Sequence, residues 1–128
     1  FGLNYILPTI TALLSANEDT LIILENPESH LHPKGQSKIG ELIAFVAQAG
    51  AQVIVETHSD HIINGIRVAT KKNQINADKI KLYYFDRNVD EEEHYSFVRE
   101  PKIDQDGRID YWPDGFLDEW DKNLMELL

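Results

Sequence analysis

The sequence predicts an α/β fold, with a parallel-sheet portion followed by an antiparallel hairpin and a closing helix. Up to about residue 78, stretches with helical spacing of apolar residues alternate with short aliphatic runs, as in a parallel sheet with crossover helices. After Lys79, strand-like stretches flank an acidic turn, and the final stretch returns to helical spacing. We therefore expect one domain with two subregions, residues 1–78 and residues 79–128.

The first helix and strand are predicted from the spacing and length of the apolar runs. The helix has apolar residues at i, i+4, i+7 and i+8, namely Ile6, Ile10, Leu13 and Leu14. Pro8 is tolerated there because it lies near the first turn, and Asn17 is the expected stop. Residues 21–24 then form an unbroken aliphatic run, which is typical of a strand covered on both faces.

The second helix and strand are bounded by helix start and stop residues. Pro33 stands at the expected start of the helix and Gly50 just beyond its end. Residues 53–55 predict a second buried strand, after which Ser59 is placed to cap a third helix with Asp60 in its first turn. The apolar stripes of these two helices are Ile39, Leu42, Ile43 and Val46, and Ile62, Ile63 and Ile66.

The C-terminal subregion is predicted as a hairpin, a turn-rich link and a helix. The stretches KIKLYYFDR and HYSFVRE are strand-like and flank the acidic turn NVDEEE. In the link, a turn at Asp106–Gly107 explains the letters DQDG better than a calcium loop, which requires a glutamate where Gly115 stands. The final helix is expected over residues 116–128. Its inward side chains would be Leu117, Trp120, Leu124 and Leu127.

Composition and charge narrow the class of protein. The 128 residues are enough for one domain with its own core. With 12 basic and 22 acidic residues the net charge is −10, so the surface as a whole matches nucleic acid phosphates poorly. No apolar run approaches the ~20 residues of a membrane span, and no signal peptide opens the chain, so we expect a soluble cytoplasmic protein. The absence of cysteine excludes disulfides and thiolate metal sites.

Acidic and other polar residues follow both predicted strands where they end. The first strand ends in Glu25, and the second ends in Glu56, Thr57 and His58. An acid that reaches water at an ordinary strand end would explain either exit alone. Because ligands of open α/β sheets gather at the carboxyl ends of parallel strands, the two exits together favour a shared site.

Several stretches resemble one family. LIILENPESHLHP, residues 21–33, resembles the magnesium-binding strand and following loop of ABC-type ATPase heads, in the branch with RecF-like, SMC-like and OLD-like AAA family proteins. VIVETHSDHIING, residues 53–65, resembles the next strand of these heads and their switch histidine. FGLNYILPTI at the start is similar to the end of their signature segment, and GRIDYWPDGFLDEW to the C-terminal tail of a bacterial subgroup. The resemblance implies part of a P-loop NTPase that uses ATP and Mg²⁺.

The resemblance also implies roles for residues at the strand exits. Glu25 would bind Mg²⁺, which takes only one or two carboxylates, and His58 would contact the γ-phosphate. The commonest pattern puts the catalytic glutamate at the place of Asn26, which cannot accept a proton. We expect Glu28 to serve as the base instead; a contribution from Glu25 itself, slow hydrolysis, or a loop-capping role for Glu28 are the alternatives.

Other residues would act across a dimer of heads. Gly2 and Asn4 lie where backbone N–H groups at a helix start would bind the nucleotide of the partner subunit. Ser29 and His30 fall in the loop that contacts the partner in such heads, so a homodimer is expected. DNA repair and defence against phage are the implied settings, with DNA or a nuclease effector contacted through other regions.

The phosphate-binding loop of these heads is not found in the sequence. GQSKIGEL supplies Gly35 and Gly40 at the right separation, but Glu41 stands where lysine is required. Because the chain also opens with Phe1 in a helical pattern, we interpret it as a fragment. Residues 1–128 alone should then show no ATPase activity, whereas the parent chain should hydrolyse ATP.

Two other functions compete with this interpretation. One is a zinc hydrolase, in which the loop with His30 and His32 and the loop with His58, Asp60 and His61 would converge on one ion. The other is a non-catalytic interaction module, in which the apolar face of the acidic C-terminal helix docks a partner instead of the core. The basic stretch RVATKK is more typical of a solvated helix end than of a DNA contact.

Overall fold

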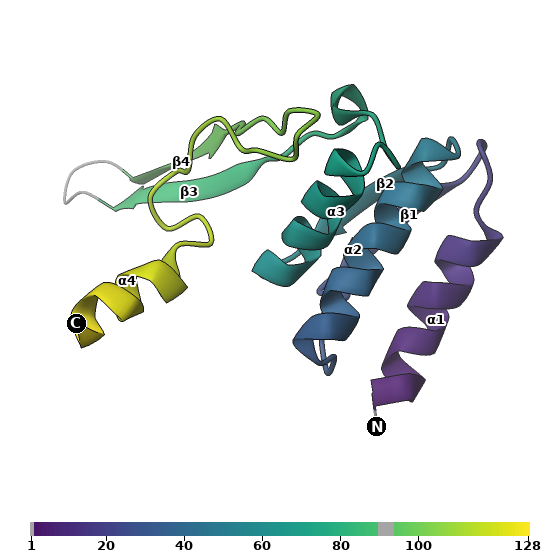
Figure 1. The fold of residues 1–128 in the computed structure, drawn as a ribbon, viewed down its shortest axis with the longest axis horizontal. Helices are drawn as coiled ribbons and strands as arrows, with labels where there is room; N and C mark the ends of the chain where they lie inside the picture. The colour runs from purple at the N-terminus through teal and green to yellow at the C-terminus, as the bar shows by residue number, and fades with distance from the viewer. Residues whose placement is uncertain (1, 90–93) are drawn as a thin grey trace.

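The computed structural model describes residues 2–89 and 94–128 and confirms the α/β class. In the first part, helices and strands alternate in the order α1 (Gly2–Ser15), β1 (Leu21–Glu25), α2 (Pro33–Gln48), β2 (Gln52–Glu56) and α3 (Asp60–Lys71). The second part contains the short 3₁₀ helix η1 (Ala77–Lys79), β3 (Tyr84–Val89), β4 (His94–Arg99) and α4 (Glu119–Leu127). Figure 1 shows the hairpin and α4 extending to one side of the α1–α3 layer.

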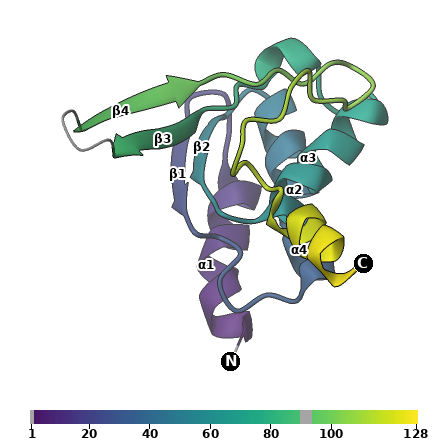
Figure 2. The same cartoon turned by 90° about the vertical axis from the view of Figure 1, so that its left-hand side faces the viewer.

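Strands β1 and β2 are parallel neighbours, in register from Leu21 opposite Gln52 to Glu25 opposite Glu56. Ile22 and Leu24 point into the core, which α1, α2 and α3 complete. The expectation that β1 is covered on both faces is wrong, since Ile23 is 70% exposed. The neighbouring Ile54 of β2 is 49% exposed on the same face. The helices lie on one side of the strand pair (Figure 2), so the described residues leave its second face open.

Helices α2 and α3 touch backbone to backbone at a pair of glycines. A Cβ added at Gly40 would overlap the carbonyl oxygen of Ile62, and one at Gly65 would overlap that of Ser37. Gly40 is therefore explained by this helix contact, and the stretch GQSKIGEL lies within α2 and not in a phosphate-binding loop. Because the backbones of α2 and α3 are in direct contact, the loops that precede these two helices are held at a fixed relative position.

The link between the hairpin and α4 packs against α3. Ile63 of α3 forms a second core cluster with Ile103, Ile109 and Phe116. Gln105 Nε2 donates to the carbonyl oxygen of Thr70 at 2.8 Å, and Arg67 Nε donates to that of Gly107 at 2.7 Å. The expected turn at Asp106–Gly107 is present, closed by the Gly107 N–H on the Asp104 carbonyl oxygen. Helix α3 thus packs against both the N-terminal subregion and the C-terminal subregion.

The predicted hairpin is confirmed, with β3 and β4 paired antiparallel from Tyr84 opposite Arg99 to Val89 opposite His94. The centre of the predicted acidic turn, residues 90–93, lies outside the described residues. Among the residues that are described, no helix combines the length and apolar character that crossing a membrane requires.

The final helix differs from the prediction in its start and in its packing. Helix α4 begins at Glu119, because Leu117 has a φ angle of +56°, which a helix starting at Phe116 could not include. Trp120, Leu124 and Leu127 are 70%, 41% and 83% exposed, so the expectation that they pack inward is wrong. Phe116 is the residue that enters the core, and the backbone then turns away from it.

Helix α4 is tied to the preceding turn by Lys122, whose Nζ lies 2.8 Å from Asp114 Oδ1 and 2.9 Å from Asp118 Oδ2. The hydrogen bond to Asp114, followed by that to Asp118, raises the pKa of Lys122 above its usual value. In turn, the hydrogen bond from Lys122 lowers the pKa of Asp118. The Asp118–Lys122 contact thus contributes its full stability between the ordinary pKa values of 3.8 and 10.5. That contribution is lost as pH falls through the lowered pKa of Asp118, or as pH rises through the raised pKa of Lys122.

Lys122→Met is expected to loosen α4, because a nine-residue helix has little stability of its own. Amide hydrogen exchange of residues 119–127 should become several-fold faster than in the wild type, with no change in α2. As pH falls from 3.8 through the lowered pKa of Asp118, the wild type should progressively lose protection of the same residues, after correction for the intrinsic pH dependence of exchange. Lys38→Met, which removes a salt bridge within α2, is the control. Equal exchange of α4 in both variants would contradict this role.

Candidate functional site

The carboxyl ends of β1 and β2 lie side by side. Glu25 and Glu56 are the last paired residues of the two strands, and the Asn26 N–H continues the ladder to the Glu56 carbonyl oxygen at 3.0 Å. Both glutamate side chains are exposed and alternate with the core residues of their strands, so both lie on the open face. His58 lies two residues after Glu56. Its side chain is 85% exposed, and its Nε2 is 3.9 Å from Glu56 Oε1.

The loop from Asn26 to His32 folds back over this edge as two consecutive turns. The Ser29 N–H donates to the Asn26 carbonyl oxygen at 3.1 Å, and the Leu31 N–H donates to that of Glu28 at 3.0 Å. Asn26 and His30 have positive φ angles of 47° and 66°, which side-chain-bearing residues adopt uncommonly. The loop is therefore compact and held in a specific shape.

Glu28 connects this loop to the exit of β2. Its Oε1 accepts the His58 N–H at 2.9 Å, a contact that spans 30 residues of sequence. Its Oε2 is enclosed and has no hydrogen-bond partner among the described residues. An enclosed carboxylate oxygen without a donor is unfavourable by about 1–3 kcal/mol, so this atom is an unmet hydrogen-bonding demand at the site.

The start of α1 reaches the same loop. The ring of Tyr5 stacks on the ring of His30, with 4.5 Å between the centroids. Gly2 and Asn4 lie in the first turn of α1, and the Asn4 side chain is exposed. Ser29 is also exposed, beside His30. The structure thus places the start of α1 and the β1–α2 loop at one edge of the molecule.

The residues of the zinc interpretation do not form one cluster in the described part of the chain. His32 is the N-cap of α2, its Nδ1 accepting the Lys34 N–H at 3.3 Å, while His30 stacks on Tyr5. His61 Nε2 lies 3.7 Å from Asp60 Oδ1 on α3. Within residues 2–89 and 94–128, no group of three or more His, Cys, Asp or Glu side chains is arranged to hold a metal ion.

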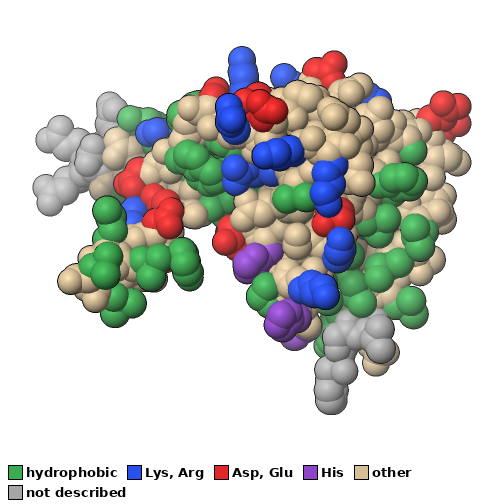
Figure 3. Space-filling view, in the orientation of Figure 1, with side chains coloured by type: hydrophobic (Ala, Val, Ile, Leu, Met, Phe, Trp, Pro, Cys, Tyr) green, Lys and Arg blue, Asp and Glu red, His purple; other side chains and the backbone are tan. Residues whose placement is uncertain are grey.

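The charged side chains are unevenly distributed over the surface. Figure 3 shows histidines gathered at the lower edge of the main body, while lysines and arginines lie above them over the middle of the view. One basic side chain lies directly beside the lower histidine in this view, so basic groups also reach this edge of the body.

Three residues of this edge were not selected from the sequence as site residues. Glu56 is brought beside Glu25 by strand register, Tyr5 reaches His30 from α1, and Gln36 hydrogen-bonds to both loops. The sequence did contain a signal for Glu56, since an acid stands at the end of the second aliphatic run, directly before Thr57. Sequence spacing carries no comparable signal for Tyr5 or Gln36, because their contacts depend on how the helices pack.

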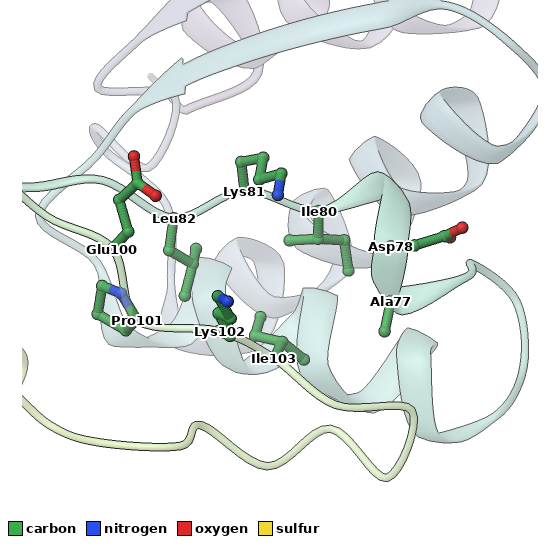
Figure 4. Close-up of a pocket in the computed structure, with 9 residues that line it drawn as sticks. All are labelled: Ala77, Asp78, Ile80, Lys81, Leu82, Glu100, Pro101, Lys102 and Ile103. Atoms are coloured by element: carbon green, nitrogen blue, oxygen red, sulfur yellow. The ribbon is translucent and has the colours of Figure 1, made fainter.

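A cavity of about 190 Å³ lies elsewhere, between η1, the start of the hairpin and residues 100–103 (Figure 4). In the close-up, Leu82 and Ile103 extend into the space between these segments, whereas Asp78 points away from it. None of the predicted site residues lines this cavity. It is smaller than a typical ligand pocket, so it does not change the choice of site.

Comparison with known proteins links the strand-exit half of the chain to one family. The family model described as "AAA domain, putative AbiEii toxin, Type IV TA system" matches residues 1–64, half of the chain. A model described as "Protein of unknown function (DUF3696)" matches residues 75–127. The Old nuclease of Escherichia phage P2 is 34% identical over 71 residues, which cover 51% of this chain and 12% of that protein's length. No solved structure matches the chain.

Proposed function

The chain belongs to the AAA domain family, and on that premise we propose that it is the C-terminal part of an ABC-type, RecF/OLD-like P-loop ATPase head. In this proposal the head binds and hydrolyses ATP at a dimer interface. The observation that carries it is the parallel register of β1 and β2. This register puts Glu25 next to Glu56, the residue that precedes the loop with His58. The similarity to the Old nuclease is consistent with the OLD-like branch of the resemblance.

The donor set at the strand exits suits ATP with Mg²⁺. Glu25 offers an exposed carboxylate at a strand end, and Mg²⁺ prefers one or two carboxylates together with phosphate oxygens and water. Glu56 is a second carboxylate at the paired position. When bound, the ion neutralises charge that develops on the phosphate oxygens. The exposed imidazole of His58 is free to approach a γ-phosphate from the neighbouring strand exit.

Glu28 is the proposed base that orients and deprotonates the attacking water. Its unpartnered Oε2 supports this role, since that oxygen can still accept a hydrogen bond once the loop admits water. Its Oε1, bonded to the His58 N–H, supports a second role in holding the two loops together. The two roles respond differently to substitution.

Glu28→Gln in the full-length protein separates the two roles. The carboxamide oxygen of glutamine can still accept the His58 N–H, but the side chain cannot take up a proton. If Glu28 is the base, ATP turnover should fall by about a hundredfold or more while ATP binding is kept. Phosphate release and equilibrium binding of a labelled nucleotide measure the two effects.

Glu18→Gln, at an exposed position before β1, is the control for the loss of one negative charge. Glu28→Ala removes both roles and should be at least as impaired as Glu28→Gln. Wild-type turnover of Glu28→Gln together with a defect in Glu28→Ala would show that Glu28 only holds the loop. The water would then be oriented by another group, for which Glu25 is the remaining candidate.

The dimer interface is proposed to include the start of α1 and the loop around His30. Gly2 and Asn4 would face the nucleotide of the partner subunit, and Ser29 and His30 would contact that subunit. The Tyr5–His30 stack supports this proposal because it joins the two segments in one surface. Residues 1–128 alone are still expected to lack turnover, since the sequence contains no phosphate-binding loop.

The biological setting is proposed from the resemblance and the family description. Defence against phage is consistent with a family described by a toxin of type IV toxin–antitoxin systems, and DNA repair with the RecF-like resemblance. Nuclease activity is not carried over to this chain, because the alignment covers 12% of the Old nuclease. DNA or a nuclease effector would be contacted through other regions of the full-length protein, whose location we propose to be the cytoplasm.

A further inference from the structure

The side chain of Gln36 bridges the two loops that carry the candidate site. Gln36 lies in the first turns of α2, and its Nε2 donates to the carbonyl oxygen of Leu31 at 2.9 Å. Its Oε1 accepts the hydroxyl of Ser59 at 2.5 Å. Leu31 belongs to the loop after β1, and Ser59 follows His58 after β2. One amide group thus joins both strand exits, in addition to the Glu28–His58 contact.

The direction of each hydrogen bond in this bridge is determined by its neighbours. Ser59 Oγ accepts the Ile62 N–H at 3.2 Å as the N-cap of α3, so its own hydrogen is available to donate to Gln36. The Leu31 carbonyl oxygen requires a donor, which only the amide nitrogen of Gln36 supplies within this bridge. Ser59 is 7% exposed, and Gln36 is half-buried. A side chain at position 36 must therefore both donate and accept.

The backbone that carries Gln36 is held in place by the contact between α2 and α3. Ser37, the next residue of α2, is the one whose carbonyl oxygen lies against Gly65 of α3. Because α2 and α3 touch there, Gln36 cannot shift along α3 without breaking that backbone contact. The Gln36 and Glu28 hydrogen bonds, together with that of the Asn26 N–H to Glu56, then oppose small movements of the two loops relative to each other.

We propose that Gln36 is a positioning residue, which holds the loop of Glu28 and the loop of His58 at the separation that ATP hydrolysis requires. This inference rests on the proposed function. It assigns Gln36 no contact with the nucleotide, so its loss affects the rate of hydrolysis more than the binding of ATP. Misplacement of reacting groups by about 1 Å lowers rates by about a hundredfold.

Gln36→Glu gives the sharpest test, in the full-length protein. A protonated glutamic acid has one O–H to donate to Leu31 and one carbonyl oxygen to accept from Ser59, whereas the ionised form has no donor. At pH 8 we expect kcat to fall by about tenfold to a hundredfold, with KM for ATP changed less than about twofold.

Two further variants separate positioning from charge and packing. Gln52→Glu introduces the same charge at the exposed start of β2 and should leave kcat unchanged. Gln36→Met has similar length but cannot make these hydrogen bonds, so its kcat should also be low while KM for ATP changes little. A Gln36→Glu variant with the kcat of the wild type, or a Gln52→Glu variant with an equal loss of kcat, would overturn the proposal.

Hydrogen exchange distinguishes failure of this inference from failure of the proposed function. Amides of residues 28–31 and 57–59 should exchange several-fold faster in Gln36→Met than in the wild type, whether or not ATP is hydrolysed. If the wild type proves to lack turnover and exchange still responds, the proposed function fails and the structural link stands. If the wild type hydrolyses ATP and neither kcat nor exchange responds to Gln36→Met, the positioning role is wrong.

Discussion

Glu25→Gln in the full-length protein is expected to lower ATP turnover by at least about a hundredfold, equivalent to about 2.7 kcal/mol of barrier height. Glu25 is exposed at the end of β1, where its carboxylate is the proposed ligand of Mg²⁺. Glutamine keeps the size of the side chain but loses the negative charge that a hard cation requires. Phosphate release measured over a Mg²⁺ titration should show lower turnover and a higher Mg²⁺ requirement.

Glu56→Gln is the matched control, because Glu56 is the residue paired with Glu25 at the end of the neighbouring strand. Its carboxylate is also exposed, so the charge change and the surroundings are closely similar. We expect a smaller loss of turnover than for Glu25→Gln. The opposite order, with Glu56→Gln inactive and Glu25→Gln active, would assign the ion to the second strand and refute the proposed role of Glu25.

Gly65→Ala is expected to destabilise the fold by about 1–3 kcal/mol, although alanine normally favours a helix over glycine by about 1 kcal/mol. The new methyl group would overlap the Ser37 carbonyl oxygen, so α2 and α3 would have to separate. Urea unfolding of the full-length protein, followed by a probe in this domain, measures the free energy change. The loops with Glu28 and His58 should become less protected from exchange at the same time, because α2 and α3 support them.

Gly35→Ala is the control for this prediction, since it makes the same substitution near the start of α2. A Cβ at position 35 would lie 3.8 Å from Leu31 Cβ, an ordinary contact. We expect this variant to be as stable as the wild type or more stable by up to about 1 kcal/mol. A Gly65→Ala variant as stable as Gly35→Ala would mean that the two helices are not closely packed in solution.

The sequence was sufficient for the elements whose boundaries depend on local chemistry. Ser59 caps α3 and Pro33 begins α2, because an N-cap hydroxyl and a proline at the first position act within one turn. The final helix was misjudged because its start is decided by the positive φ of Leu117, which no apolar pattern reveals. The aliphatic run of β1 likewise does not indicate which of its faces a neighbour covers.

The candidate site shows the same division. Glu25 and His58 were selected because an acid and a histidine follow aliphatic runs, and Glu28 because of the family resemblance. The structure brings the exits that carry them together. The contributions of Glu56 and Gln36 depend on strand register and on the approach of α2 to α3, which depend on residues far apart in sequence. Such contacts can be read from coordinates but not from the spacing of residue types.

The bare side of the β1–β2 pair has a practical consequence for work in solution. Leu21, Ile23 and Ile54 there are 54%, 70% and 49% exposed, and among the described residues no third strand pairs with β1 or β2. Such surfaces adhere to one another in a concentration-dependent way. Light scattering of purified residues 1–128 over a dilution series should therefore show concentration-dependent aggregation. The full-length protein is accordingly the better choice for kinetic measurements.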